Sequence, residues 1–302
     1  MLRTISKIGF TLLLASSLDI TGQVINPTTA LAGVITLPDG GRCEGEVSNG
    51  SLNGKVVCEY ANGDRYEGNF VDGEKDGQGV YTFADGGRYE GEFKAGQISG
   101  QGVREYPEGD SYEGQFSEGV PNGSGVYTSA NGARYEGEFT DGAPSGKGAF
   151  VFANGDRCEG EVSDGKINGQ GVCEYKNGNR YEGELLNSQP HGQGTYTFAS
   201  GGSYEGEFSQ GKFNGTGIRE YANGNRYEGE FRDGKPEGKG TLVVAGEGRY
   251  EGQFNDGKFS GQGVYTFENG NRYEGDFSNG QFNGQGVYTF ANGDRCEGEF
   301  SS

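Results

Sequence analysis

The stretch from Tyr66 to Arg88, YEGNFVDGEKDGQGVYTFADGGR, decides the fold because it returns in recognisable form every 23 residues. Eleven copies are complete, a twelfth is partial, and no insertion breaks their register. An exact period of this length marks a repeat array, in which each unit packs mainly against its neighbours. Each copy starts with a tyrosine or a cysteine: Cys43, Tyr66, Tyr89, Tyr112, Tyr135, Cys158, Tyr181, Tyr204, Tyr227, Tyr250, Tyr273 and Cys296.

Each repeat predicts two short strands, and repeat positions are counted below from this first residue. Residues 66–70 alternate apolar and polar side chains, and residues 79–83 are rich in aromatic and β-branched side chains; both patterns are typical of strands. The intervening residues 71–78 contain two glycines and no helical periodicity, which indicates a loop. Both connections are short, so every strand pair should be antiparallel.

The turn after the second strand sets which side chains share a face. A two-residue Asn-Gly loop would put Tyr81 and Tyr89 on opposite faces, whereas a three-residue loop over 84–86 with Gly86 in a left-handed bulge puts them opposite each other. The second register is favoured because it gathers the rings, and the glycines between them leave space for neighbouring rings. The predicted aromatic face comprises Tyr66, Phe70, Tyr81, Phe83, Tyr89 and Phe93, and the reverse face carries columns of Glu and Arg.

Residues 1–32 lie outside the array and predict an export signal. Arg3 and Lys7 precede the apolar run 8–18, and Ala30-Leu31-Ala32 provides a small-residue cleavage pattern, as in a secretory signal peptide. We expect cleavage after Ala32 and export to a periplasm or the extracellular space; an uncleaved membrane anchor is the alternative. The array then follows as a half-repeat at 33–42, eleven full repeats at 43–295 and a terminal half-repeat at 296–302.

The charge excludes one class of partner. With 44 acidic and 25 basic residues, the chain has a net charge of −19. An acidic protein is repelled by phosphate backbones and by anionic lipid headgroups, so nucleic acid is not expected as a partner and membrane lipid is disfavoured. The high glycine content alone would suggest disorder, but the glycines keep a fixed register and 12% of the residues are aromatic, unlike disordered segments.

The cysteines follow the repeat. Cys43 and Cys58 occupy positions 1 and 16 of one repeat, and Cys158 and Cys173 occupy the same positions five repeats later. In an exported protein this pattern predicts two local disulfides, Cys43–Cys58 and Cys158–Cys173; buried free thiols in place of tyrosine are the alternative. Cys296 has no such mate and either stays free or links two chains.

Catalytic chemistry lacks the necessary residues. The chain has one histidine and no His/Cys cluster, and its carboxylates recur identically in every repeat. Transition-metal sites and Ser-His chemistry therefore have no candidate residues, and equivalent carboxylates do not form the distinct acid and base that a glycosidase requires. We expect no enzyme activity, no cofactor and no metal.

The signature Tyr-Glu-Gly-Glu-Phe-x-x-Gly-x-x-x-Gly-x-Gly-Val-Tyr, repeated at 23 residues across residues 34–302, resembles the MORN repeat family. The resemblance implies an all-β, elongated, single-layer antiparallel β-meander built from β-hairpin repeats, used as a scaffold or interaction platform and sometimes dimeric. The expected function is therefore a non-enzymatic exported scaffold that binds a protein partner, with homodimerisation as a further expectation. Peripheral binding to membrane phospholipid in the cell envelope is the alternative.

Overall fold

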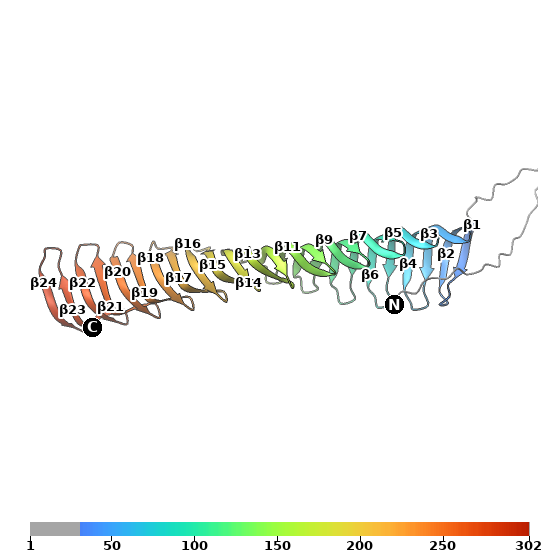
Figure 1. Cartoon of the computed structure of the whole chain (residues 1–302). Helices are drawn as coiled ribbons and strands as arrows, with labels where there is room; N and C mark the ends of the chain where they lie inside the picture. Colours follow the sequence, from blue (N-terminus) through green and yellow to red (C-terminus); the bar gives the residue numbers. More distant parts are fainter. Residues whose placement is uncertain (1–30, 302) are drawn as a thin grey trace, which may run out of the picture. The chain divides into compact units, whose positions relative to one another are not determined.

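The computed structural model describes residues 31–301, which fall into two compact units divided after Ala130. These residues form strands and turns and contain no helix (Figure 1). The predicted signal peptide lies outside the described residues except for Leu31 and Ala32, which begin the first strand, β1.

The first unit contains nine strands, each paired with its neighbours in sequence. They are β1 (Leu31–Thr36), β2 (Arg42–Ser48), β3 (Ser51–Glu59), β4 (Arg65–Val71), β5 (Glu74–Thr82), β6 (Arg88–Lys94), β7 (Gln97–Glu105), β8 (Ser111–Ser117) and β9 (Val120–Thr128).

The second unit repeats the same alternation over fifteen strands. They are β10 (Arg134–Thr140), β11 (Ala143–Val151), β12 (Arg157–Ser163), β13 (Lys166–Glu174), β14 (Arg180–Leu186), β15 (Gln189–Thr197), β16 (Gly202–Ser209), β17 (Lys212–Tyr221), β18 (Arg226–Arg232), β19 (Lys235–Val244), β20 (Gly248–Asn255), β21 (Lys258–Phe267), β22 (Arg272–Ser278), β23 (Gln281–Thr289) and β24 (Arg295–Phe300). Within each unit all pairings are antiparallel between consecutive strands, so the predicted single-layer meander of hairpin repeats is confirmed.

The turn between β5 and β6 has the predicted three-residue form. The amide of Phe83 donates to the carbonyl of Gly87 at 2.8 Å, the amide of Gly86 donates to the carbonyl of Phe83 at 3.0 Å, and Gly86 has a φ of 94°. Tyr81 consequently lies directly opposite Tyr89. A glycine is needed at Gly86 because other residues rarely adopt this left-handed conformation.

The predicted loop over residues 71–78 is wrong. Strand β4 continues to Val71 and β5 begins at Glu74, so only Asp72 and Gly73 turn the chain, with φ values of 51° and 88°. Two consecutive positive φ values are typical of a type I′ hairpin turn, which favours Asp-Gly. Gly77, with a φ of 83°, lies where the register shifts between Gly68 and Phe70. This β-bulge interrupts the strand-like alternation that sequence reasoning looks for.

Each tyrosine at position 1 covers two glycines with its ring. A Cβ added to Gly79 would meet Tyr66 Oη at 2.5 Å and Tyr66 Cε2 at 2.6 Å. A Cβ added to Gly68 would meet Tyr66 Oη at a similarly short distance. The Tyr66 ring is fully buried, with edge contacts to Phe70 at 5.4 Å and to Phe93 of the next repeat at 5.0 Å. Its hydroxyl donates to the carbonyl of Asn69 at 2.9 Å. The core of this single-layer sheet therefore consists of tyrosine rings that pack against glycine residues of the same sheet.

The three-residue turns are joined from repeat to repeat by one carboxylate or amide. Asp64 Oδ1 accepts a hydrogen bond from the Ala84 amide at 2.8 Å, and Asp64 Oδ2 accepts one from the Tyr81 hydroxyl at 2.6 Å. Such contacts fix the spacing of successive hairpins, because a turn amide that faces no strand needs another partner. The side chains that accept from the next turn are Asp64, Asp110, Asp156, Asn179, Asn225 and Asn271.

Candidate functional site

The predicted aromatic face separates into a core and a half-exposed margin. Tyr66, Phe70, Tyr89 and Phe93 are between 0% and 7% exposed, so they hold the repeats together and offer no surface to a ligand. Their neighbours at positions 16 and 18, such as Tyr81 and Phe83, are only half-buried. Sequence reasoning placed all six residues on one face but did not distinguish these two roles.

The position 18 residues form a margin that we call the aromatic edge. They immediately precede the three-residue turns, and they are partly exposed, with Phe152 and Phe290 at 38% and 40%. An aromatic ring that neither the sheet nor a second layer covers is available to a partner. The aromatic edge comprises Tyr60, Phe83 and Tyr106 in the first unit and Phe152, Tyr175, Phe198, Tyr221, Phe267 and Phe290 in the second.

Rings alternate along this edge from one repeat to the next. The ring of Tyr81 at position 16 lies 5.9 Å from Tyr60 of the preceding repeat and 4.6 Å from Phe83 of its own. In the second unit Tyr196 lies in the same way between Tyr175 at 5.7 Å and Phe198 at 4.7 Å. Position 16 therefore joins successive members of the aromatic edge into a ladder of rings.

An arginine replaces the ring at position 16 in two repeats. The Arg104 guanidinium carbon lies 3.6 Å from the centroid of the Phe83 ring and 5.4 Å from that of Tyr106. The Arg219 guanidinium carbon lies 3.5 Å from the Phe198 centroid and 5.1 Å from the Tyr221 centroid. The two arginines thus occupy equivalent places, one in each unit, and contact the ring faces by cation–π interaction.

A lysine lies among tyrosines in the second full repeat. Lys75 Nζ is 4.9 Å, 5.4 Å and 5.6 Å from the ring centroids of Tyr81, Tyr60 and Tyr66. Burial lowers the pKa of Lys75, and the negative charge of Asp64 only partly opposes this shift. Equivalent positions carry leucine, isoleucine, proline or phenylalanine, so Lys75 is the charged exception in a row of packed side chains.

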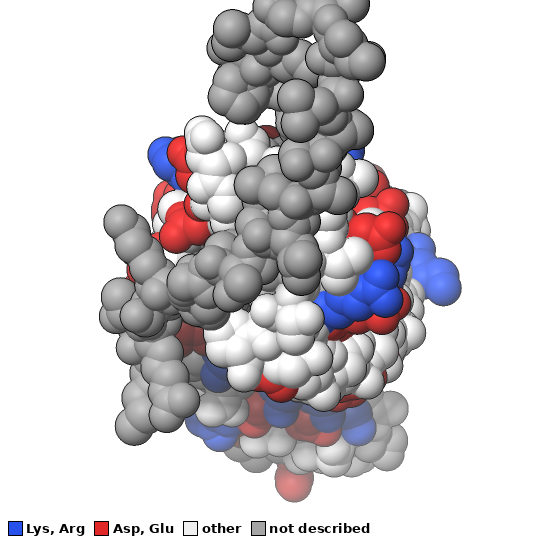
Figure 2. Space-filling model, turned by 90° about the vertical axis from the view of Figure 1, so that its right-hand side faces the viewer, with Lys and Arg blue, Asp and Glu red and all other residues white. Residues whose placement is uncertain are grey.

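The reverse face carries paired charges, as predicted. Arginine and glutamate two residues apart on the same strand form ion pairs, including Arg65–Glu67 at 2.8 Å, Arg157–Glu159 at 2.6 Å and Arg88–Glu90. Positive and negative side chains lie side by side on the surface in Figure 2. Exposed pairs contribute about 0–1 kcal/mol each, so these ion pairs add little stability.

Two shallow depressions lie on the paired-charge face. One, of about 880 Å³, is lined in the second unit by Glu136, Lys147, Arg157, Glu159 and Glu182 among others. The other, of about 580 Å³, is lined in the first unit by side chains of the same kinds, including Lys55, Glu67, Arg88 and Glu90. Ligand sites are usually apolar hollows with a few convergent polar groups, whereas each of these depressions is lined by charged side chains of both signs and contains one ion pair, Arg157–Glu159 in the larger depression and Arg88–Glu90 in the smaller.

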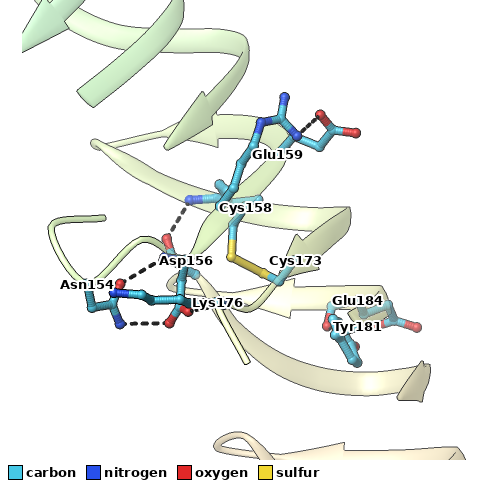
Figure 3. The surroundings of a disulfide bond; sticks show 11 residues. Asn154, Asp156, Cys158, Glu159, Cys173, Lys176, Tyr181 and Glu184 are labelled. Carbon is cyan, nitrogen blue, oxygen red and sulfur yellow. Dashed lines mark hydrogen bonds and ion pairs between the residues drawn. A yellow bond between two sulfur atoms is a disulfide. The ribbon is translucent and has the colours of Figure 1, made fainter. Parts of the chain in front are cut away.

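Both predicted cysteine pairs are disulfide-bonded in the structure. Cys43 lies opposite Cys58 and Cys158 lies opposite Cys173, with 4.0 Å between the Cα atoms of each pair. Figure 3 shows the second disulfide beside Asp156, whose carboxylate accepts hydrogen bonds from the Lys176 amide at 2.8 Å and from Asn154 Nδ2 at 2.7 Å. Cys296 is free and exposed on β24.

Residues 31–301 contain no group of three or more metal-ligating side chains. The raised pKa values belong to tyrosines, for example Tyr60 and Tyr89, which burial raises to about 12. A tyrosine with a raised pKa keeps its proton at neutral pH and cannot act as a base. Residues 31–301 contain no helix of the length and apolar character needed to cross a membrane.

Comparison with solved structures finds proteins of distant likeness. A TCP10 domain of Danio rerio CPAP in complex with a peptide of Danio rerio STIL is 13% identical, covers 89% of this chain and all of that chain, and has a TM-score of 0.36. A virginiamycin B lyase from Staphylococcus aureus is 12% identical over 91% of this chain and 85% of that one, with a TM-score of 0.15. No curated protein matches the sequence.

A family model gives the decisive match. The MORN repeat model matches eleven consecutive segments: residues 43–65, 66–88, 89–111, 112–134, 135–157, 158–180, 181–203, 204–226, 227–243, 250–272 and 273–295. The short ninth segment ends just before residues 245–248, where the turn glycines are displaced. Each matched segment begins at the tyrosine or cysteine whose ring or disulfide lies over the backbone of its repeat. Because the eleven segments together cover most of the sequence, the chain belongs to the MORN repeat family.

Proposed function

We propose that the chain is an exported, non-enzymatic scaffold that binds a protein partner along its aromatic edge. MORN repeats are compatible with a scaffold for protein or membrane interaction. The observation that carries the proposal is the half-exposed ladder of rings at positions 16 and 18, exemplified by Tyr81 and Phe83. Aromatic side chains contribute large contact areas with little loss of conformational entropy when a partner binds.

Two features support this proposal, one for a protein rather than a lipid surface and one for an oxidising compartment. The net charge of −19 opposes anionic headgroups. The two disulfides are compatible with export, because such bonds persist in oxidising compartments. The residues predicted to direct export, 1–32, lie almost entirely outside the described part of the chain, and cleavage after Ala32 stays part of this proposal.

Site-specific photo-crosslinking tests the surface. A photoreactive residue in place of Phe83 or Phe152, on the aromatic edge, should capture a protein from the native extracellular or envelope fraction. The same residue in place of Glu90, on the paired-charge face, is the matched control and should capture far less. Equal capture from both faces would refute the assignment of the aromatic edge.

Liposome co-sedimentation separates the two kinds of partner. Mixed with vesicles of zwitterionic and anionic phospholipid, the protein should stay in the supernatant. Sedimentation that is lost when Phe152 and Phe290 are changed to serine would instead establish lipid binding through the aromatic edge.

Self-association is a separate part of the proposal and is tested through Cys296, which is free and exposed. A dimer band on a non-reducing gel should disappear in Cys296→Ser. A band that persists in this variant would place the link elsewhere, and absence of a band in the unaltered protein would exclude a disulfide-linked dimer.

A further inference from the structure

Arg104 and Arg219 differ from the arginines of the paired-charge face in having no acidic partner. Arg65, Arg157 and their equivalents pair with a glutamate two residues away. Among the described residues, by contrast, Arg104 Nε and Arg219 Nη1 are buried and have no hydrogen-bond partner. A buried donor without an acceptor costs about 1–3 kcal/mol. Each guanidinium is nevertheless held over an aromatic ring at the margin of the sheet.

A structural role alone does not require a cation at this position. Five other repeats carry tyrosine at position 16, namely Tyr81, Tyr127, Tyr196, Tyr265 and Tyr288. Those rings complete the ladder, and several also bond the turn side chain of the preceding repeat, as Tyr196 does with Asn179 at 2.8 Å. Replacing such a ring by arginine keeps a planar group in the ladder but adds a positive charge and unused donors.

The structure assigns to Arg104 and Arg219 the role of two matching sites, each for the carboxylate of a peptide segment in the polyproline II conformation. This inference rests on the proposed scaffold function and names the chemistry of its partner. A guanidinium binds a carboxylate through two parallel N–H···O bonds. The rings beside each arginine, Phe83 and Tyr106 or Phe198 and Tyr221, provide aromatic surface for the apolar residues on either side of that carboxylate.

The conformation of the ligand follows from the spacing of the aromatic edge. One repeat contains two strands, and neighbouring strands lie about 4.8 Å apart, so equivalent rings recur about every 9.6 Å within a unit. A polyproline II helix has three residues per turn and rises about 3.1 Å per residue, which gives a period of about 9.3 Å. A segment lying along the edge would therefore present the same face to each successive repeat. Proline rings on aromatic grooves are an established mode of peptide recognition.

The turn residue that follows each arginine differs in charge between the two sites. Near Arg104, the turn side chain Asp110 accepts hydrogen bonds from Tyr127 and from the Ala130 amide. Near Arg219, the equivalent turn residue is the neutral Asn225, which bonds the Ala245 amide at 3.1 Å. Because a like charge disfavours an incoming anion, the Arg219 site should bind a carboxylate more tightly than the Arg104 site.

Fluorescence anisotropy with short labelled peptides tests this inference on the full chain. The probes are (Pro-Pro-Glu)₄, its neutral counterpart (Pro-Pro-Gln)₄ and the flexible (Gly-Ser-Glu)₄. We expect (Pro-Pro-Glu)₄ to bind about tenfold more tightly than the other two, because only it combines the matching period with a carboxylate. Arg219→Tyr should weaken (Pro-Pro-Glu)₄ binding about tenfold and Arg104→Tyr less, while (Pro-Pro-Gln)₄ binding stays unchanged.

The tyrosine substitutions preserve the fold because they install the side chain that five other repeats carry at this position. Arg226→Gln, on the paired-charge face, is the matched control and should bind all three peptides as the unaltered protein does. Equal affinity of (Gly-Ser-Glu)₄ and (Pro-Pro-Glu)₄ would refute the polyproline II part. An unchanged preference for glutamate in the Arg104→Tyr/Arg219→Tyr double variant would refute the role of the arginines.

Failure of all three peptides to bind the unaltered protein would overturn the inference as a whole. The proposed scaffold function would be judged separately, by whether the photoreactive residues at Phe83 and Phe152 capture a protein.

Discussion

The fit between the Tyr66 ring and the Gly79 backbone predicts a strong, reciprocal coupling between these two residues. A Cβ at Gly79 would meet the hydroxyl oxygen and two ring carbons of Tyr66 at 2.5–2.7 Å, closer than non-bonded atoms can lie. The ring has no room to move, because it is fully buried and contacts Phe70 and Phe93 by their edges. Gly79→Val alone should therefore cost about 2–3 kcal/mol of unfolding free energy through overpacking.

The first full repeat contains a natural version of the compensating change. There, Cys43 replaces the tyrosine and Val56 replaces the glycine, and Val56 is 1% exposed. Valine fits at that position because no ring covers it. Tyr66→Ala alone should cost about 3–5 kcal/mol as a buried aromatic ring is lost. Combined with Gly79→Val, which refills part of that space, the total cost should fall about 2 kcal/mol below the sum of the single changes.

Urea unfolding followed by intrinsic tyrosine fluorescence measures the effect, since the chain has 18 tyrosines and no tryptophan. Hydrogen exchange over residues 66–88 should locate the loss in this repeat, because stability in an array is a sum of local terms. Ala84→Ser in the adjacent exposed turn is the control and should stay within about 0.5 kcal/mol. Strictly additive costs for the two changes would show that the ring and the glycine do not share space.

Three further changes test other parts of the array. Cys158→Ser with Cys173→Ser should lower the unfolding free energy by about 3 kcal/mol, as expected for a link across 15 residues; an unchanged urea midpoint in the absence of reductant would contradict this. Lys75→Phe should stabilise the first unit by about 1 kcal/mol, because phenylalanine stacks on the position 1 tyrosine where it occupies this position, as Phe213 does on Tyr204 at 3.9 Å. Burial lowers the pKa of Lys75, so the folded protein gains stability as pH rises toward the ordinary value of 10.5. The advantage of Lys75→Phe should therefore shrink as pH rises toward that value, and a difference that is constant or grows with pH would show that the lysine is not desolvated. Asp64→Ala should cost about 1 kcal/mol at pH 7, measured by thermal unfolding, because the Tyr81 hydroxyl and the Ala84 amide lose their acceptor. Partial burial alone would raise the pKa of Asp64, but the hydrogen bonds that its carboxylate accepts outweigh burial and lower the pKa. The stability that Asp64 contributes is therefore present above about pH 3.8 and is lost as pH falls. Asp64→Asn should remove this loss of stability in acid, and a variant that still showed it would locate the titrating group elsewhere.

The repeat period and the ring pattern were enough to predict the fold and the pairing of Tyr81 with Tyr89. Both predictions depend on the alternation of apolar and polar residues and on the positions of the glycines, which can be read from any single repeat. The second hairpin turn was missed even though Asp72-Gly73 is a favoured type I′ pair. The β-bulge at Gly77 places three residues of β5, 76–78, opposite the single residue Asn69, and it interrupts the apolar and polar alternation, so that the first part of β5 does not resemble a strand.

The row of side chains at position 10 was also missed, because its members share burial and not chemistry. Leu52 and Ile167 are 4% and 0% exposed, Phe213 stacks on Tyr204, and the same position holds Pro121 and Lys75. A pattern search looks for one kind of residue, whereas this position requires only a side chain that fills the space beside position 1, whether a tyrosine or a cysteine stands there. The proposed partner surface likewise needed the structure, since the burial of the side chains distinguishes Tyr66 from Phe83 and their residue types do not.

The two repeats with disulfides show which side chains fill the space above the strand glycines when no tyrosine ring is present. In most repeats a tyrosine ring fills the space above two glycines. Where Cys158 replaces the tyrosine, Gly160 and Gly171 are retained, but a Cβ on them would meet Ile167 at 2.7 Å and Leu185 at 2.5 Å. Aliphatic side chains from positions 10 and 5 therefore fill the space that the ring leaves. The first repeat fills it with Val56 instead, so each cystine occurs with its own aliphatic substitute, and a cysteine pair placed in any other repeat would need one as well.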